Sequence, residues 1–174
     1  KSGRNLLWFL LKQSVSLLKK IPGKQTRDLL ERYMTIGRFA FHTKQSSTLS
    51  DLEDQYPEGT GFVILPMDLA YMDAGLPPVS YADQMAELAR LKAKKKHIYP
   101  FVFVDPRRMA ADKTFFDYHV TPEGKVVLNK CFIKDYIEGH VVKEKNNGED
   151  TELKVPPFSG FKIYPALGYY PFDP

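Results

Sequence analysis

The chain has 174 residues, of which 43% are hydrophobic and 26% are charged, which is the composition of an ordinary globular domain and excludes a disordered chain. Its 25 basic residues are nearly balanced by 21 acidic ones, so the net charge of +4 gives nucleic-acid binding little support. The single cysteine, Cys131, excludes an internal disulfide framework and is typical of a reducing compartment, so we expect a cytoplasmic protein.

Residues 1–58 are predicted to form a helical segment. Apolar residues at helical spacing predict a helix from Asn5 to Lys20. Two further helices are expected, one over about residues 26–41 and a short one that begins at Ser50. The lysines of the first helix raise the alternative of a membrane-surface helix. The wide apolar stripe favours packing in a core, so we expect no membrane partner.

A strand–helix–strand unit is predicted over residues 59–108. The apolar runs at 61–66 and 98–104 are typical of strands that are covered on both faces. Between them, Ser80 is predicted to cap a helix over about residues 80–95, with Asp83 at its third position. The lysines at the end of this helix suit the helix dipole and need no nucleic acid to explain them. This order of elements predicts parallel pairing of the two strands.

A further strand is predicted over residues 158–164, after a long interruption. Period-2 alternation points Phe161 and Ile163 to one face, and Lys162 and Tyr164 to the other. The interruption, residues 109–157, is predicted to be an elaborated crossover with extended pieces at 125–128 and 152–155 and a brief helix near 131–138. We expect the strands at 61–66, 98–104 and 158–164 to be adjacent, parallel and in that order, with the helix at 80–95 on the outer face.

Four stretches in this order resemble the amidohydrolase superfamily, in the branch that includes metal-dependent hydrolases and nonoxidative decarboxylases. They are Gly61-Phe-Val-Ile-Leu-Pro-Met-Asp68, Gln84 with Leu88-Ala-Arg-Leu91, Pro100-Phe-Val-Phe-Val-Asp-Pro-Arg-Arg108, and Gly160-Phe-Lys-Ile-Tyr-Pro165. The resemblance covers roughly residues 60–108 and 158–171. It implies an α/β fold of the (β/α)8 TIM-barrel type, in which these strands would be the second, third and fourth.

The chain departs from the family in having no His-x-His pair, with which the family's first strand holds its metal. A complete barrel also needs about 250 residues. We therefore interpret residues 1–174 as a single partial domain, about half a barrel and an internal portion of a longer protein. Its parts would be the helical segment 1–58, the βαβ unit 59–108, the crossover 109–157, and the strand and loop 158–174.

The resemblance implies metal-dependent hydrolysis, in which a metal-activated water attacks a C–N or C–O bond of a small-molecule substrate. The metal would be a divalent ion, zinc, held by the intact protein; we expect this chain alone not to bind it and to be inactive. The remainder of the barrel or a second copy is the expected protein partner. Nonoxidative decarboxylation on the same scaffold is one alternative, and a binding or scaffold module without catalysis is another.

The catalytic candidates are Lys162, Asp68 and Asp105, each near the carboxyl end of a predicted strand. The resemblance implies that a carboxylated Lys162 would bridge two metal ions. The alternatives are that Lys162 pairs with a carboxylate, for which the two aspartates are the nearest partners, or binds an anionic substrate. The aspartates would orient substrate or loops, or only form turns.

The substrate-binding candidates are two arginines and two tyrosines. Arg107 and Arg108 would clamp a substrate carboxylate, or would pair with acidic groups of a neighbouring loop. Tyr164 and Tyr169 would line the mouth of a pocket, or would pack over the rim of the barrel. The four histidines match no metal signature, so we expect a structural or surface role for each. Cys131 has no evident base beside it, so we expect a buried, inert thiol.

Overall fold

The computed structural model describes residues 28–29, 32–33, 42, 44–71, 75–146 and 149–168. The chain divides into two compact units, residues 1–55 and residues 56–174. The helix predicted from Asn5 to Lys20 lies outside the described residues, as does Tyr169. Of the helix predicted over residues 26–41, only residues 28–29 and 32–33 are described, and these are helical.

In the first unit, helix α3 (Gln45–Glu53) contains the short helix that was predicted from Ser50, but it begins earlier. Leu49 is its buried residue. The His42 ring contacts Asp51 with 2.6 Å between Nε2 and Oδ2, which ties the segment before the helix to the helix itself.

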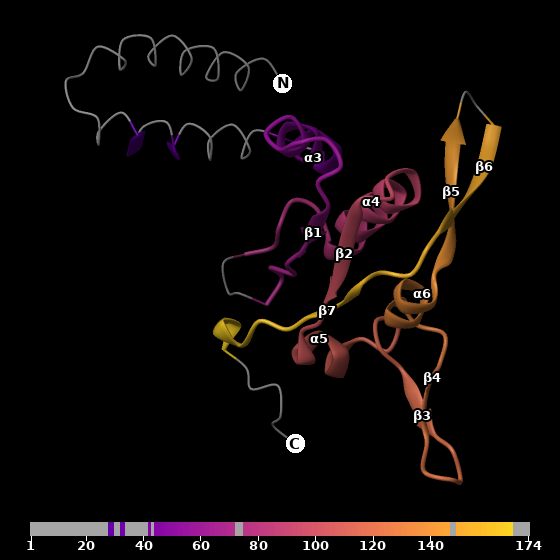
Figure 1. Cartoon of the computed structure of the whole chain (residues 1–174). Helices are drawn as coiled ribbons and strands as arrows, with labels where there is room; N and C mark the ends of the chain where they lie inside the picture. Colours follow the sequence, from indigo (N-terminus) through magenta and orange to yellow (C-terminus); the bar gives the residue numbers. More distant parts are fainter. Residues whose placement is uncertain are drawn as a thin grey trace. The chain divides into compact units, whose positions relative to one another are not determined.

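Three strands of the second unit form a parallel sheet in the order β1 (Phe62–Ile64), β2 (Ile98–Phe103) and β7 (Gly160–Lys162) (Figure 1). The register places Ile64 opposite Pro100, and Phe103 opposite Lys162. The neighbours, direction and order that we expected for these strands are confirmed. A short 3-10 helix, η1 (Pro165–Leu167), follows β7.

Helix α4 (Tyr81–Lys94) packs against this sheet and begins where the sequence predicts. The Ser80 side chain accepts a hydrogen bond from the Asp83 amide at 3.1 Å, which confirms the predicted cap. Ile98 and Val102, which lie on the same face of β2, are fully buried, and so are Met85 and Leu88 of α4. These side chains form the core between the helix and one face of the sheet.

Tyr81 completes the edge of β2 beyond the point where β1 stops. The Val104 amide donates to Lys162 O at 3.0 Å, so the backbone groups of Phe103 point away from β7. The Tyr81 hydroxyl donates to Phe103 O at 3.1 Å and accepts from Phe103 N at 2.8 Å. It thereby takes the place of a strand neighbour. Burial raises the pKa of Tyr81 far above its usual value, so its phenol stays neutral.

The segment between β2 and β7 folds into local units. They are helix α5 (Pro106–Ala111), the hairpin of β3 (Tyr118–Val120) and β4 (Val126–Leu128), helix α6 (Phe132–Glu138), and the hairpin of β5 (His140–Asn146) and β6 (Glu149–Val155) (Figure 1). The extended pieces predicted at 125–128 and 152–155 and the helix near 131–138 are confirmed. Helix α5 and strands β3 and β5 were not predicted.

The prediction of an incomplete (β/α)8 barrel is wrong for this structure. In the described part of the chain, only β1, β2 and β7 pair in parallel, and the other strands pair antiparallel in two separate hairpins. The physical reason is that pairing with a complementary strand a few residues away costs less loop-closure entropy than pairing with a distant parallel strand. The observed fold is mixed α/β, with small sheets of two or three strands and, among the described residues, four α-helices.

Candidate functional site

Two buried aspartates lie at the carboxyl edge of the parallel sheet. Asp68 is in the segment after β1, and Asp105 follows β2. Each exposes 1% of its surface, and no other charged residue in the described part of the chain is so deeply buried. A buried carboxylate is stable only when it is paired or hydrogen-bonded, so the partners of these two residues define the site.

Asp105 is paired with Arg107 of α5. Asp105 Oδ1 accepts from the Arg107 backbone amide and from its Nε, both at 2.9 Å, and Oδ2 accepts from Nη2 at 2.7 Å. The backbone contact caps α5, and Pro106 occupies the first turn, where its missing N–H costs nothing. Both oxygens of Asp105 are therefore engaged, and its charge is neutralised by its own helix.

Asp68 is paired with Arg108, the next residue of α5. Arg108 Nε donates to Asp68 Oδ2, and Asp68 Oδ1 accepts from the Ala70 amide at 3.1 Å. The hydrogen bond to Asp68 raises the pKa of Arg108 above its usual value. Because Asp68 follows β1 and Arg108 follows β2, this pair joins the ends of the two strands. Of the two alternatives for Arg108, pairing with an acidic group of a neighbouring loop is the one observed.

Aromatic rings hold the Arg108 guanidinium. Its Cζ lies 5.3 Å from the centre of the Tyr71 ring and 5.7 Å from that of Phe115. The Arg107 Cζ lies 5.5 Å from the same Tyr71 ring. A guanidinium has five N–H donors, and the Arg108 side chain is 21% exposed, so donors remain for a ligand after Nε has bound Asp68.

Lys162 lies at the carboxyl end of β7, and its registered partner is Phe103. Phe161 is registered with the buried Val102, so alternation places Lys162 on the face of the sheet opposite to the α4 core. Its amine lies 5.8 Å from the centre of the Phe103 ring and 5.3 Å from that of Tyr164. The aspartates proposed as its partners are paired with arginines instead, and among the described residues Lys162 makes no ion pair.

These residues do not fit the metal that the family resemblance implies. In the described part of the chain, no three His, Cys, Asp or Glu side chains gather as a metal would require. The carboxylates of Asp68 and Asp105 are already neutralised by arginines. The histidines make local contacts, such as that of His119 Nδ1 to Asn129 Oδ1 at 2.8 Å. We therefore assign no reaction step to a metal.

Comparison with protein-family models, with curated proteins and with solved structures finds no match to this chain. The resemblance to the amidohydrolase superfamily therefore stays a prediction, as do the cytoplasmic location and the second-copy partner. None of the helices in the described ranges has the length and apolar character needed to cross a membrane.

Sequence reasoning missed Tyr71 and the role of the Tyr81 hydroxyl, although it places the Tyr81 ring on the apolar face of its helix; both shape this edge as much as the charged residues do. Tyr71 comes soon after Asp68 in the loop beyond β1, so its position past a strand end was the available signal. Tyr81 directly follows the helix cap Ser80, and the first turn of a helix that packs on a parallel sheet lies near the carboxyl edge.

Proposed function

We propose that this chain binds a small molecule with a carboxylate or phosphate group at the carboxyl edge of the β1-β2-β7 sheet. The observation that carries the proposal is the pairing pattern at this edge. Arg107 and Arg108 neutralise the two buried aspartates, while Lys162 makes no ion pair within the described part of the chain. Among the described residues of this edge, there is therefore one positive charge more than the carboxylates balance, and that charge lies on Lys162.

The surroundings of Lys162 favour an anion over water. Its side chain is half-buried, and its amine lies against the rings of Phe103 and Tyr164. Attraction between opposite charges grows as the local dielectric constant falls, so an anion gains more energy beside this amine than beside a lysine in open solvent. A charge-assisted hydrogen bond to the ammonium would fix the orientation of the bound group.

Arg108 is the second group that we propose for contact with the ligand. Asp68, Tyr71 and Phe115 hold its guanidinium in one place before any ligand arrives. A cation that is already ordered loses little conformational entropy on binding, so more of the interaction energy contributes to affinity. Ligands also commonly bind beyond the carboxyl ends of parallel strands, where the loops diverge.

Metal-dependent hydrolysis and nonoxidative decarboxylation stay predictions that rest on the family resemblance. An anion-binding edge would serve either reaction by holding a carboxylate of the substrate, and it would equally serve a binding module without catalysis. The proposal of anion binding is therefore common to all three hypotheses and is tested first.

Calorimetric titration with succinate tests the proposal, with succinamide as the uncharged analogue. We expect Lys162→Ala to weaken succinate binding at least about tenfold, because a hydrogen bond to a charged group contributes roughly 1.5–3 kcal/mol. The control is Lys125→Ala, which removes an exposed lysine of the β3–β4 turn and should leave the affinity unchanged.

Two results would refute the proposal. One is equal succinate affinity in the unmodified chain and in Lys162→Ala. The other is succinamide binding as tightly as succinate, which would show that charge does not matter at the site. Thermal unfolding of each variant without ligand verifies that the comparison is made between folded proteins.

A further inference from the structure

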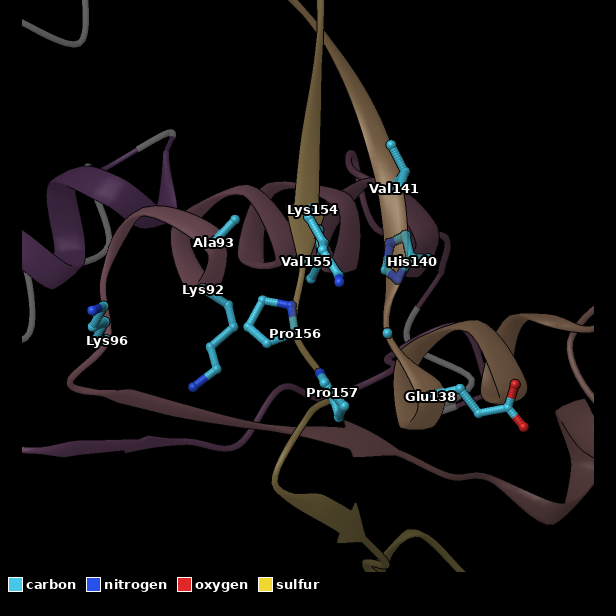
Figure 2. Close-up of a pocket in the computed structure, with 11 residues that line it drawn as sticks. Lys92, Ala93, Lys96, Glu138, His140, Val141, Lys154, Val155, Pro156 and Pro157 are labelled. Carbon is cyan, nitrogen blue, oxygen red and sulfur yellow. The ribbon is translucent and has the colours of Figure 1, made fainter.

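A cavity of about 530 Å³ lies at the other end of the parallel sheet (Figure 2). It is lined by the last turn of α4, the junction of α6 with β5, and the end of β6. The α4 residues precede β2, and the β6 end precedes β7, so the cavity is at the amino edge of these strands. Its volume is in the range of small-molecule sites.

The walls of the cavity are apolar and conformationally restricted. Val155, Pro156 and Pro157 form one wall, and Ala93 of α4 contributes to another. The proline rings fix the backbone of this wall. Gly139 adopts φ +84°, and a Cβ there would meet Val155 O at 2.8 Å, so the close approach of α6 to the end of β6 requires glycine.

The polar groups of the lining are mainly cationic. Lys92, Lys96 and Lys154 line the cavity, together with the single carboxylate of Glu138. In Figure 2 the Glu138 carboxylate points away from the two prolines. Lys92 Nζ donates to Ile98 O at 2.7 Å, which fixes the amine and leaves two of its three N–H donors for a ligand. Within the described residues, neither Lys96 nor Lys154 makes an ion pair.

His140 adds an oriented polar group. Its Nδ1 lies 3.1 Å from the Asp135 carbonyl oxygen, and because a carbonyl only accepts, Nδ1 carries the proton in this contact. The ring packs against Tyr136, with 4.6 Å between ring centres. The hairpin that carries His140 is joined to α4 by the ion pair between Lys94 Nζ and Glu144 Oε1 at 2.7 Å. The walls are thus held together before a ligand binds.

We propose that this cavity binds a medium-chain carboxylate, an organic anion with an apolar body. The carboxylate would contact the amines of Lys92 and Lys154, and the chain would lie along Val155 and the two prolines. Apolar walls with a few oriented charged groups are the usual composition of a small-molecule site. The proposal is independent of the anion site at the carboxyl edge.

Calorimetric titration of the full chain with octanoate, below the concentration at which it forms micelles, tests this proposal. Octan-1-ol has the same tail without the charge, and acetate has the charge without the tail. We expect octanoate to bind at least about tenfold more tightly than either compound, because both parts of the site contribute. Lys154→Ala should weaken octanoate binding about tenfold. Lys143→Ala should leave it unchanged, because Lys143 is an equally exposed lysine of the same hairpin that does not line the cavity.

A second variant tests the location. Ala93→Trp would fill the cavity from α4 and should abolish octanoate binding. Undiminished binding in this variant, equal affinities in Lys154→Ala and Lys143→Ala, or no octanoate binding by the unmodified chain would overturn the proposal. If Ala93→Trp unfolds the chain, the comparison of octanoate affinity between Lys154→Ala and Lys143→Ala is sufficient to test the proposal. Lys162→Ala should remove only weaker octanoate binding at the carboxyl edge and leave the tighter affinity of the cavity unchanged, so each proposed site is tested separately.

Discussion

The hydroxyl of Tyr81 should be one of the most important single atoms for the stability of the second unit. Tyr81→Phe removes it and leaves the amide and carbonyl of Phe103 without the partner that they have at 2.8 and 3.1 Å. Each buried backbone group without a partner costs roughly 1–3 kcal/mol, so for the two groups we expect the free energy of unfolding to fall by about 2–6 kcal/mol. The ring itself remains, with its contacts to Phe103 and Phe132.

Tyr136→Phe is the matched control. Tyr136 is also a buried tyrosine within an aromatic cluster, but among the described residues no hydrogen bond is found for its hydroxyl. Its removal should therefore change the unfolding free energy by less than about 1 kcal/mol.

Urea denaturation followed by circular dichroism gives the free energy of unfolding of Tyr81→Phe and of Tyr136→Phe. For a chain of this length, each kcal/mol corresponds to about 2–4 °C in the midpoint of thermal unfolding. Equal stability of Tyr81→Phe and Tyr136→Phe would refute the role that we give to the Tyr81 hydroxyl.

Three further predictions concern ion pairing, alkaline pH and backbone geometry. Arg108→Ala should lower the unfolding free energy by roughly 3–5 kcal/mol, because the buried Asp68 carboxylate loses its cation; denaturation that matches the unmodified chain would contradict this. Burial raises the pKa of Tyr136 from 10.0 to about 12. The neutral phenol therefore contributes fully to the free energy of unfolding below pH 10.0, and this contribution is lost as the pH rises to about 12. Over that range we expect the free energy of unfolding to fall by roughly 2–3 kcal/mol because of Tyr136. Denaturation at each pH should show a smaller fall in Tyr136→Phe than in the unmodified chain. Gly139→Ala should destabilise the chain more than Gly124→Ala, which also has positive φ but open space around it, and equal thermal midpoints would argue against this.

The sequence predicts the parallel sheet and its helix well because their signals are strong and local. Continuous apolar runs mark β1 and β2 as strands, and Ser80 with Asp83 marks the start of α4. The prediction that both faces of these strands are covered is wrong, because Val63 of β1 and Tyr99 of β2 are exposed. The barrel prediction fails in the segment between β2 and β7. Strands β5 and β6 are rich in exposed charged residues, so they lack the apolar alternation by which a strand is usually detected, and they pair with each other instead.

The positions of the candidate residues were easier to predict than their partners. Parallel strand ends bring Asp68, Asp105 and the two arginines to one edge, as the spacing indicates. The choice of Arg108 for Asp68, in place of Lys162, depends on the path of the loop after β1 and on where α5 begins. Neither feature has a sequence signal as strong as a hydrophobic run, so the pairing could not be predicted.

The most direct test of the proposed anion site is to map succinate binding by the amide resonances of the labelled chain in two-dimensional NMR. We predict saturable shifts at residues 68–71 and 160–164, around the ends of β1 and β7, and their loss in Lys162→Ala. We predict no comparable shifts at residues 139–141 or 154–155, which line the cavity at the opposite edge. Shifts confined to the cavity, or none at the carboxyl edge at saturating succinate, would contradict the proposal.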